Sequence, residues 1–563
     1  MENLPPFVNK GEPCKLSWAT NVRFTRDGGV SNRLGFEEKA DLATSAKIDD
    51  IIKLPTLGGI MFAKSGTGIF QSVNGSTWYT VGLTRTAAAR EFLYSHEKDV
   101  FATNGTDNYT RIACSKVTTT FADTDVEITV DDIAQFAISG TVYIDGDAIG
   151  YTGVSGSKFT GVTGIVAGGH AAGAIVTQTS SPSGAPNGTW IAELEGSAIV
   201  GNGATVYVSN PATKWEPELF YDFSLTTGGT SKRIDSDTTA GVAGLGAVLI
   251  GTKRGMDIAT GFQADAGGLL IRTLSKVHPI PNARCLCEGE REFYALTDAG
   301  RILPIMNLDT GFQVVDDPNN PRNNLDFPVQ KYIRENKDPD DNSQNFIHYD
   351  PASRELTVCL LLTTGITAEF VLQRDLGAWS LDTTKTFSCK TNFKDRVYCG
   401  SDSTGKIYLD NEGVTDAGTV ITSRIVTGKL RLGRKGVTGD YLLLKSGGLL
   451  NATGEFYQRI YINSGSTPLE ELITADALQS DGNMDVTTGV PVGSGTVGAE
   501  TIGTAGETVD AYRFDLPYEI LFSAEEIQLE WEIYGDTASG TQFELRYFDF
   551  SGETEAALIV PHS

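Results

Sequence analysis

The chain has 563 residues, a formal net charge of −26 and 63 glycines, and 40% of its residues are hydrophobic. This length exceeds what one hydrophobic core can serve, so about two to four domains are expected. The acidic balance excludes a broad basic face that would grip nucleic acid, and the lack of any apolar run of about 18 residues excludes a membrane-spanning helix.

Residues 1–50 are predicted to form an extended N-terminal segment that ends in a hairpin. Leu16–Phe24 and Val30–Phe36 alternate as strands, and Arg26–Gly29 supplies the turn between them. The opening residues lack the basic stretch and the apolar stretch of a secretory signal. We therefore expect the chain to be made and folded in a host cytoplasm, where its seven cysteines stay reduced.

Residues 51–117 and 181–435 repeat one pattern, in which short strand-like runs are broken by Gly, Asn and Asp turns. Ile60–Ala63, for example, leads through Gly66–Gly68 into Ile69–Val73. Radial closure lets a long series of hairpins protect its sheet edges. At roughly 40–50 residues per blade, the two stretches predict an all-β propeller of about six to eight blades.

Residues 118–180 separate the two propeller stretches and differ from them in composition. They contain a single Lys, no Arg and no Cys, and they are rich in Thr, Ala, Gly and Val. Thr141–Ile144, Ala148–Thr152 and Ala174–Thr177 are predicted strands. The segment is therefore expected to be a small β domain inserted into the propeller.

Residues 436–563 are predicted to form a C-terminal β-sandwich-like domain. In Ile527–Tyr534 apolar residues alternate with Gln and Glu, which is typical of a strand with one buried face. Thr467–Glu470 supplies an N-cap, a Pro at the first helical position and a capping-box Glu. This last pattern predicts a short helix.

No catalytic, cofactor or metal site is predicted, and the chain is not expected to be an enzyme. Ser72–Trp78 resembles the Asp-box turn of sialidase propellers, which is a structural turn. Asp338–Asn342 begins like a calcium loop but lacks the Gly and the Glu that such a loop needs. Cys285 and Cys287 would point the same way from a strand, but no further metal ligands lie nearby in the sequence.

One basic cluster stands out in this acidic chain. Its five members lie within a dozen residues: Arg424, Lys429, Arg431, Arg434 and Lys435. A salt-bridged strand or a solvated face would explain the cluster. The functional alternative is a contact with the acidic surface of a neighbouring subunit, or with DNA in a channel.

Three segments carry a family resemblance. They are Trp18–Val30 with Asn32–Phe36; Val206–Pro211 with Trp215; and Gly377–Ser380 with Val397–Asp402 and Gly405–Tyr408. Taken in this order, they resemble the tail nozzle and packaged-DNA stabilisation proteins of short-tailed, podovirus-like phages. Within the insert, Ile149–Val154 and Phe159–Gly164 are similar to small β modules of phage structural proteins.

The resemblance implies a structural virion protein of the phage tail. Its copies would form a homohexameric ring below the portal and the portal-adaptor (head-to-tail connector) protein, and would also contact tail fibres or tail needle and ejection proteins. Double-stranded DNA would be retained and then conducted through the ring without specific binding. The net charge of −26 fits this role, because a passage lined with carboxylates repels the genome instead of holding it.

Two other functions are compatible with the sequence. The first is a fibre-attachment or receptor-binding module, in which exposed Trp78, Trp190 and Trp215 would stack on sugars. The second is a propeller glycosidase, which needs two carboxylates that converge at one mouth of the propeller.

Overall fold

The structure of the protein is a computed structural model. It describes residues 7–8, 13–14, 16–25, 29–182, 184–210, 222–224, 229–262, 268–309, 311–431, 438–451, 455–474, 484–486, 511–524, 526–534 and 543–554.

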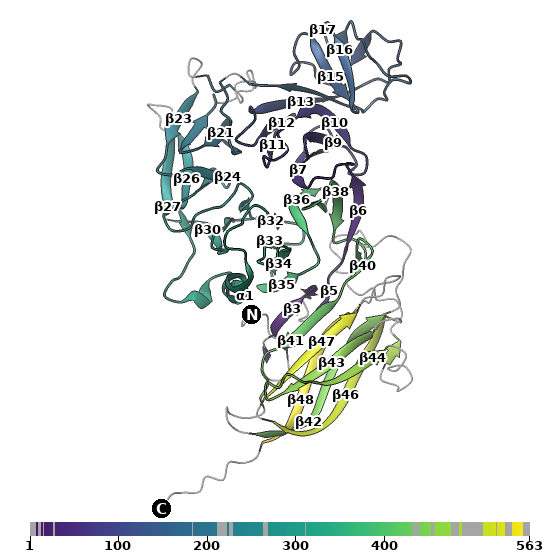
Figure 1. Ribbon diagram of the computed structural model, residues 1–563, viewed down its shortest axis with the longest axis vertical. Helices are drawn as coiled ribbons and strands as arrows, with labels where there is room; N and C mark the ends of the chain where they lie inside the picture. The colour runs from purple at the N-terminus through teal and green to yellow at the C-terminus, as the bar shows by residue number, and fades with distance from the viewer. Residues whose placement is uncertain are drawn as a thin grey trace, which may run out of the picture.

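Seven sheets stand around one axis and form a seven-bladed propeller (Figure 1). The innermost strands contact one another in the order β7, β11, β20, β24, β28, β32 and β36, and β36 returns to β7. The prediction of an all-β propeller of six to eight blades is therefore confirmed, with the number fixed at seven.

The strands of each blade are given from the axis outward. Blade one has β7 (Ile48–Leu54), β8 (Ile60–Ser65), β9 (Gly68–Ser72) and β10 (Tyr79–Thr84), and blade two has β11 (Phe92–His96), β12 (Asp99–Thr103), β13 (Thr110–Lys116) and β19 (Ile175–Ser180). Blade three has β20 (Trp190–Leu194), β21 (Ser197–Asn202), β22 (Thr205–Val208) and β23 (Thr230–Arg233), and blade four has β24 (Thr238–Gly244), β25 (Ala247–Thr252), β26 (Met256–Phe262) and β27 (Leu269–Ser275). Blade five has β28 (Leu286–Glu288), β29 (Glu292–Leu296), β30 (Ile302–Leu308) and β31 (Gly311–Val314), and blade six has β32 (Phe346–Asp350), β33 (Glu355–Leu361), β34 (Thr367–Gln373) and β35 (Ala378–Asp382).

Blade seven closes the ring with a strand from the other end of the chain. It has β36 (Phe387–Phe393), β37 (Arg396–Ser401), β38 (Lys406–Asp410) and β6 (Phe36–Asp41), and the short strands β39 (Thr415–Asp416) and β40 (Thr419–Val420) continue it. β6 pairs antiparallel with β38, from Phe36 opposite Asp410 to Asp41 opposite Lys406. This pairing ties the first blade to the last and covers an edge that would otherwise stay open.

A β-sandwich adjoins the propeller at the end opposite the insert (Figure 1). One of its sheets has β3 (Leu16–Thr20), β41 (Ser423–Thr427), β47 (Ile527–Tyr534), β43 (Glu455–Ile462) and β44 (Leu469–Thr474). The other has β4 (Val22–Phe24), β5 (Val30–Asn32), β48 (Phe543–Thr554), β42 (Gly439–Asn451), β46 (Ala511–Ala524) and β45 (Met484–Val486). A separate two-stranded sheet, β1 (Phe7–Val8) with β2 (Pro13–Cys14), precedes them.

Three expected boundaries differ from the sheets that the chain forms. The segment 1–50 is shared between the sandwich, which takes β3 to β5, and the propeller, which takes β6. The sandwich gains β41 at 423–427, before the expected start at residue 436, and blade two takes β19 at 175–180 from the expected insert 118–180. Each difference comes from pairing with a strand that is distant in the sequence, which local pattern does not reveal.

The helix expected from Thr467–Glu470 is wrong. Leu469–Thr474 forms strand β44 instead, which pairs along β43 from Ile460 opposite Leu469 to Glu455 opposite Thr474. A neighbouring strand with open hydrogen-bonding groups therefore overrides the local capping pattern. The neighbouring prediction is confirmed, because β47 spans Ile527–Tyr534 and its alternate apolar side chains are buried.

The insert leaves blade two after β13 and returns into it at β19 (Figure 1). It contains β14 (Glu127–Thr129), β15 (Gly140–Ile144), β16 (Asp147–Tyr151), β17 (Gly153–Ser155) and β18 (Lys158–Thr160). β15 pairs with β19, so β15 and β16 extend the blade, while β14, β18 and β17 form their own sheet. Most of the insert's buried apolar side chains form one cluster, which also includes Ala113 of β13 and Val176 of β19.

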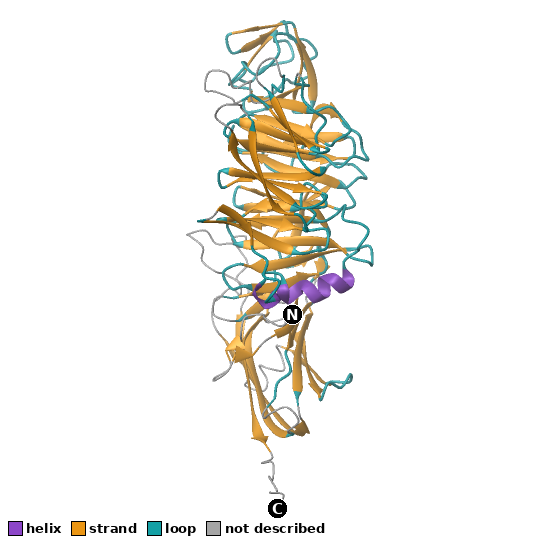
Figure 2. Ribbon diagram, turned by 90° about the vertical axis from the view of Figure 1, so that its left-hand side faces the viewer, coloured by secondary structure: helices purple, strands orange, loops and turns teal. Residues whose placement is uncertain are grey.

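Among the described residues, the buried apolar side chains of the sandwich do not form a separate core. One contiguous apolar cluster runs from Ala240 and Ile258 in blade four, through Phe370 in blade six, to Trp531 and Phe543 in the sandwich. Seen from the side, insert, propeller and sandwich follow one another along the long axis, with helix α1 (Phe327–Asn336) at the sandwich end of the propeller (Figure 2). A short 3-10 helix, η2 (Pro321–Asn323), precedes α1.

Within the described ranges, no helix combines the length and the apolar character that crossing a bilayer requires.

Candidate functional site at the propeller–sandwich junction

The N-terminal strands β3, β4 and β5 lie where the propeller meets the sandwich. β3 runs parallel to β35 of blade six and antiparallel to β41, so the blade and one sandwich sheet become a single nine-stranded sheet. The chain changes sheets at Asn21, whose φ of 54° lies in the left-handed region that Asn tolerates. The Asn21 side chain donates to the Thr422 carbonyl at 2.8 Å and accepts from the Thr383 N–H at 3.2 Å.

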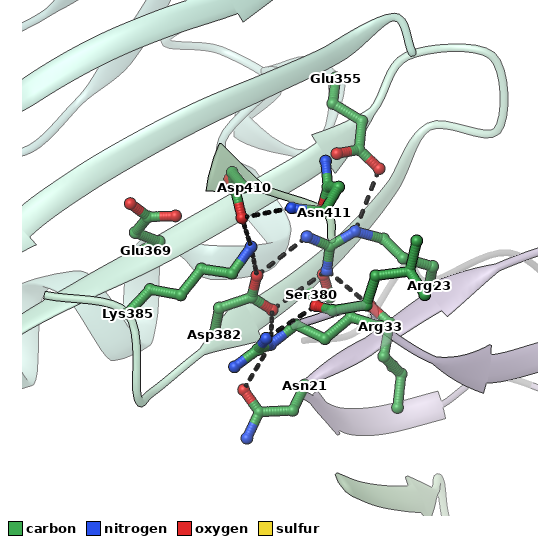
Figure 3. A network of polar contacts seen from close by, with 12 residues as sticks. Asn21, Arg23, Arg33, Glu355, Glu369, Ser380, Asp382, Lys385, Asp410 and Asn411 are labelled. Carbon is green, nitrogen blue, oxygen red and sulfur yellow. Dashed lines mark hydrogen bonds and ion pairs between the residues drawn. The ribbon is translucent and has the colours of Figure 1, made fainter. Parts of the chain in front are cut away.

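A buried ion network fills this junction, and Asp382 at the end of β35 is its first centre (Figure 3). The Asp382 side chain is 0% exposed and has three cations around it. Arg23 Nη2 lies 2.9 Å from its Oδ2, Lys385 Nζ lies 3.5 Å from Oδ2, and Arg33 Nε lies 3.7 Å from Oδ1. Two of the cations come from the N-terminal strands, and the third comes from the loop after blade six.

Asp410 at the end of β38 is the second centre. Lys385 Nζ lies 2.5 Å from its Oδ1, and Lys390 Nζ lies 2.7 Å from its Oδ2. Lys390 also contacts Glu369 Oε2 at 2.8 Å. Because Lys385 contacts both aspartates, the two centres form one network that spans blades six and seven.

Two further pairs attach the N-terminal segment. Arg23 Nε lies 3.0 Å from Glu355 Oε1. Arg33 makes a two-pronged contact with Asp416, with Nη1 at 2.8 Å from Oδ1 and Nη2 on Oδ2. Two-pronged pairs of a guanidinium and a carboxylate are among the stronger side-chain contacts, and they also fix how the two groups are oriented relative to each other.

The carboxyl pKa values in the network diverge because burial and neighbouring cations act in opposite directions. Burial raises the pKa of Asp382 and Asp410, but the surrounding cations outweigh burial and hold both values well below the ordinary 3.8. Burial prevails at Glu355 and Glu369 and raises their pKa above 4.5. The two aspartates are therefore firmly ionised, which suits charge pairing and does not suit proton transfer near neutral pH.

The space beside the network is too small for a substrate. A hollow of about 10 Å³ is lined by residues that include Arg23, His348, Glu355 and Asp410, which is near the lower limit for one water. Burial and the charge of Lys390 lower the pKa of His348 to about 4, so this imidazole is neutral at pH 7. The chemistry that this arrangement supports is the joining of chain segments.

Two arginines cross the propeller bore. Arg90, just before β11 of blade two, donates to the carbonyls of Ser343, just before blade six, and of Ser388 in blade seven, the latter at 3.0 Å. Arg284, just before β28 of blade five, bonds Asp50 of blade one and donates to the Glu91 carbonyl at 2.6 Å. Both side chains thus reach across the axis to nearly opposite blades and close this mouth of the bore.

Carboxylates near the axis are engaged by cations. Asp49 Oδ2 lies 2.5 Å from Lys64 Nζ, and Glu91 Oε1 lies 2.7 Å from Arg85 Nη2. A glycosidase would need two carboxylates that are free to protonate the substrate and to attack it. Among the described residues, no group of three or more His, Cys, Asp or Glu side chains is placed to hold a metal ion.

The basic cluster expected to form an interface or channel contact lies along the sandwich. Arg424 on β41 pairs with Glu530 of β47 at 2.7 Å. Lys429 and Arg431 both pair with Glu526, and these hydrogen bonds, together with one from Ser464, lower the pKa of Glu526 to about 2. Three of the five cations thus form ion pairs within the chain, which is the arrangement expected of a salt-bridged strand. The Lys429 side chain nevertheless remains 51% exposed. Arg434 and Lys435 lie outside the described residues.

The tryptophans proposed to stack on sugars do not form one exposed surface. Trp190 is 0% exposed in the core between blades three and four, which overturns its expected exposure. Trp78 belongs to the turn that Ser72–Trp78 was expected to form, and its Nε1 donates to the Gly75 carbonyl at 3.0 Å. Trp215 lies outside the described residues.

Sequence reasoning did not identify the junction network. Its cations and acids stand in strands or beside them, often next to apolar residues, as in Val22–Phe24 and Ala378–Asp382. A charge in such a run is a signal for a buried ion pair. The partner could not be read from the sequence, since Arg23 and Asp382 are 359 positions apart.

Neither a scan of protein-family models nor a search of curated protein sequences finds a match for this chain. Among solved structures, the computationally designed Ika8 protein is similar with a TM-score of 0.35 and 11% identity, over 66% of this chain and 99% of that chain. YCF48 bound to a D1 peptide has a TM-score of 0.35 and 12% identity, over 66% and 94%. YCF48 from Cyanidioschyzon merolae has a TM-score of 0.31 and 11% identity, over 67% and 98%. The propeller described above rests on the strand pairing, and these likenesses carry no statement about function.

Proposed function

We propose that this chain is a non-enzymatic structural protein of a phage tail, whose copies form a hexameric ring below the portal and its adaptor. One observation carries the proposal. The first and third segments that resemble tail nozzle proteins, which are more than 300 positions apart, meet at the junction, where β3 lies beside β35 and β6 lies beside β38. Two of the three resembling segments therefore lie side by side, while Val206–Val208 of the second lies in blade three.

The junction suits a part that must keep its shape while a genome passes. A shared nine-stranded sheet, a continuous apolar core and a buried ion network hold propeller and sandwich together. Two domains are expected to move relative to each other unless their interface is large and hydrophobic. The interface between propeller and sandwich is hydrophobic and also contains main-chain strand pairing. A rigid two-domain unit is a suitable building block for a ring.

The passage in this proposal lies between copies of the chain. Arg90 and Arg284 close one mouth of the propeller bore, and a bore that two side chains can span does not admit a DNA duplex. A ring of propellers, each with a closed bore, would surround the genome at its centre. The net charge of −26 per copy would favour sliding over non-specific binding.

The proposed partners follow from this position: other copies of the chain, the portal-adaptor protein, and tail fibres or needle and ejection proteins. A gold-labelled epitope on the chain, followed in particles that assemble in infected host cells, tests the proposal. We expect the label on the tail directly below the portal. Label on the fibre tips alone would favour the receptor-binding alternative, and particles without label would end the proposal.

A further inference from the structure

A hollow of about 250 Å³ lies between blade one and the insert. Strands β9 and β10 and the turn between them form one wall, and the β15–β16 turn with the approach to β19 forms the other (Figure 1). The residues that matter here are Gln71, Val73, Asn74, Thr77 and Tyr79 of blade one and Asp145 of the insert.

Contacts between insert and blade hold the two walls in place. Gly82 on β10 has a φ of 71°, and a Cβ built on it would lie 1.9 Å from the Tyr143 ring of β15. The insert therefore packs so closely on blade one that only glycine fits beneath the ring. The hollow is a preformed feature between docked parts.

The lining contains a buried polar group without a partner. Gln71 is 1% exposed, and its Oε1 has no hydrogen-bond partner among the described residues, while its Nε2 donates to the Ile175 carbonyl at 3.5 Å. Buried amide oxygens are rarely left unpaired, and each such case needs an explanation. The accessible area of this oxygen is below 1 Å², so it belongs to the covered part of the wall and does not face a ligand in the hollow.

The other polar groups supply both donors and acceptors. Asn74 Oδ1 accepts from the N–H groups of Ser76 and Thr77, both at 2.9 Å, so its amide nitrogen remains as a donor. The Asp145 carboxylate is 29% exposed and pairs with His170 Nδ1 at 3.6 Å. The Tyr79 ring and Val73 add apolar surface to the same hollow.

This composition selects a small neutral polyol. No Lys or Arg lines the hollow, so a phosphate or a carboxylate ligand would lack a counter-charge. Hydroxyl groups both donate and accept, which matches the Asn74 amide donor beside the Asp145 carboxylate acceptor. The volume is below the roughly 300–1,000 Å³ of pockets for drug-sized ligands, so one ring fits and a longer chain does not.

We propose that this hollow binds a single neutral hexose unit. The Asp145 carboxylate would accept from a sugar hydroxyl, the Asn74 amide would donate to one, and the Tyr79 ring would cover an apolar face. The inference goes beyond the structural role proposed above and does not depend on ring formation.

Saturation-transfer NMR on the purified full-length chain tests the site, with D-glucose, D-galactose, D-mannose, N-acetyl-D-glucosamine and L-rhamnose as probes. We expect transfer to at least one sugar, with an affinity of about 1 mM. Asp145→Asn removes the charged acceptor, and Tyr79→Ala removes the ring. Each should weaken binding about tenfold.

Asp123→Asn is the matched control, because it removes an equal charge at an exposed position of the same insert outside the hollow. It should leave binding unchanged, and thermal melts should show that every variant is folded. No transfer to any of the five sugars would overturn the proposal. Transfer that persists equally in Asp145→Asn and Tyr79→Ala would overturn it as well.

Discussion

The sandwich and the insert are joined to the same propeller in different ways. The sandwich shares a sheet, an apolar core and a buried ion network with blades six and seven. The insert extends the sheet of blade two through β15, but its apolar cluster takes in only a few residues of that blade, among them Ala113 and Val176. It contacts blade one around a hollow. The contrast teaches that propeller and sandwich are joined through core, sheet and charge together, whereas the insert is a module that can carry a separate task.

The largest expected effect comes from breaking the sandwich side of this comparison. Asp382→Asn leaves three buried cations without their shared carboxylate, and unpairing a buried ion of this kind costs about 3–5 kcal/mol. Urea unfolding followed by tryptophan fluorescence measures the loss. Hydrogen exchange should accelerate in β3, β4 and β35 and stay unchanged in β15 and β16.

Asp237→Asn is the control, because its partner Lys253 is 66% exposed and the pair lies on the surface. Its effect should stay below about 1 kcal/mol. Equal effects of the two substitutions would show that the network does not hold the junction.

Acid should weaken the same junction in a defined pH window. The pKa of His348 falls from 6.5 to about 4 on folding, so the folded state prefers the neutral ring. Stability from this group is fully present above pH 6.5 and is lost as the pH falls towards 4, by at most about 3 kcal/mol. His348→Gln should reduce that loss, as measured by urea midpoints across the window. An unchanged pH profile would contradict the role given to His348.

The insert side is tested by Gly82→Ala. The added Cβ meets the Tyr143 ring, so the insert must shift, at a cost of about 1–3 kcal/mol. Gly156→Ala is matched to it, because Gly156 also has a positive φ, of 60°, but nothing lies within 4 Å of its Cβ. The difference between the stability losses of the two variants measures the contribution of the contact between Gly82 and the Tyr143 ring. Faster exchange in β3 and β35 of Gly82→Ala would contradict the separation of the two regions.

The smallest effect is expected at the basic cluster. Lys429→Ala removes a half-exposed cation, and Glu526 keeps Arg431 and Ser464, so stability should change by less than about 0.5 kcal/mol. If Lys429 also contacts a neighbouring copy, Lys429→Glu should weaken ring assembly in mass photometry while the monomer melts normally. A large loss of monomer stability would assign the cluster to folding alone.

The sequence indicated strands well and their partners poorly. Ile527–Tyr534 was recognised because one buried face imposes a period of two, and Val22–Phe24 pairs antiparallel with Val30–Asn32 within the predicted hairpin. The closure of the ring by β6 and the pairing of Arg23 with Asp382 depend on contacts across more than 350 positions. No local pattern encodes such contacts, and the same limit explains why Leu469–Thr474 was expected to be a helix.

Cryo-electron microscopy of the purified full-length chain tests the central claim most directly. The account predicts closed rings of six copies, in which propeller and sandwich keep one fixed orientation, the passage runs between copies, and each propeller bore stays closed by Arg90 and Arg284. Particles that remain single copies at micromolar concentration, with the sandwich in variable orientations relative to the propeller, would contradict it.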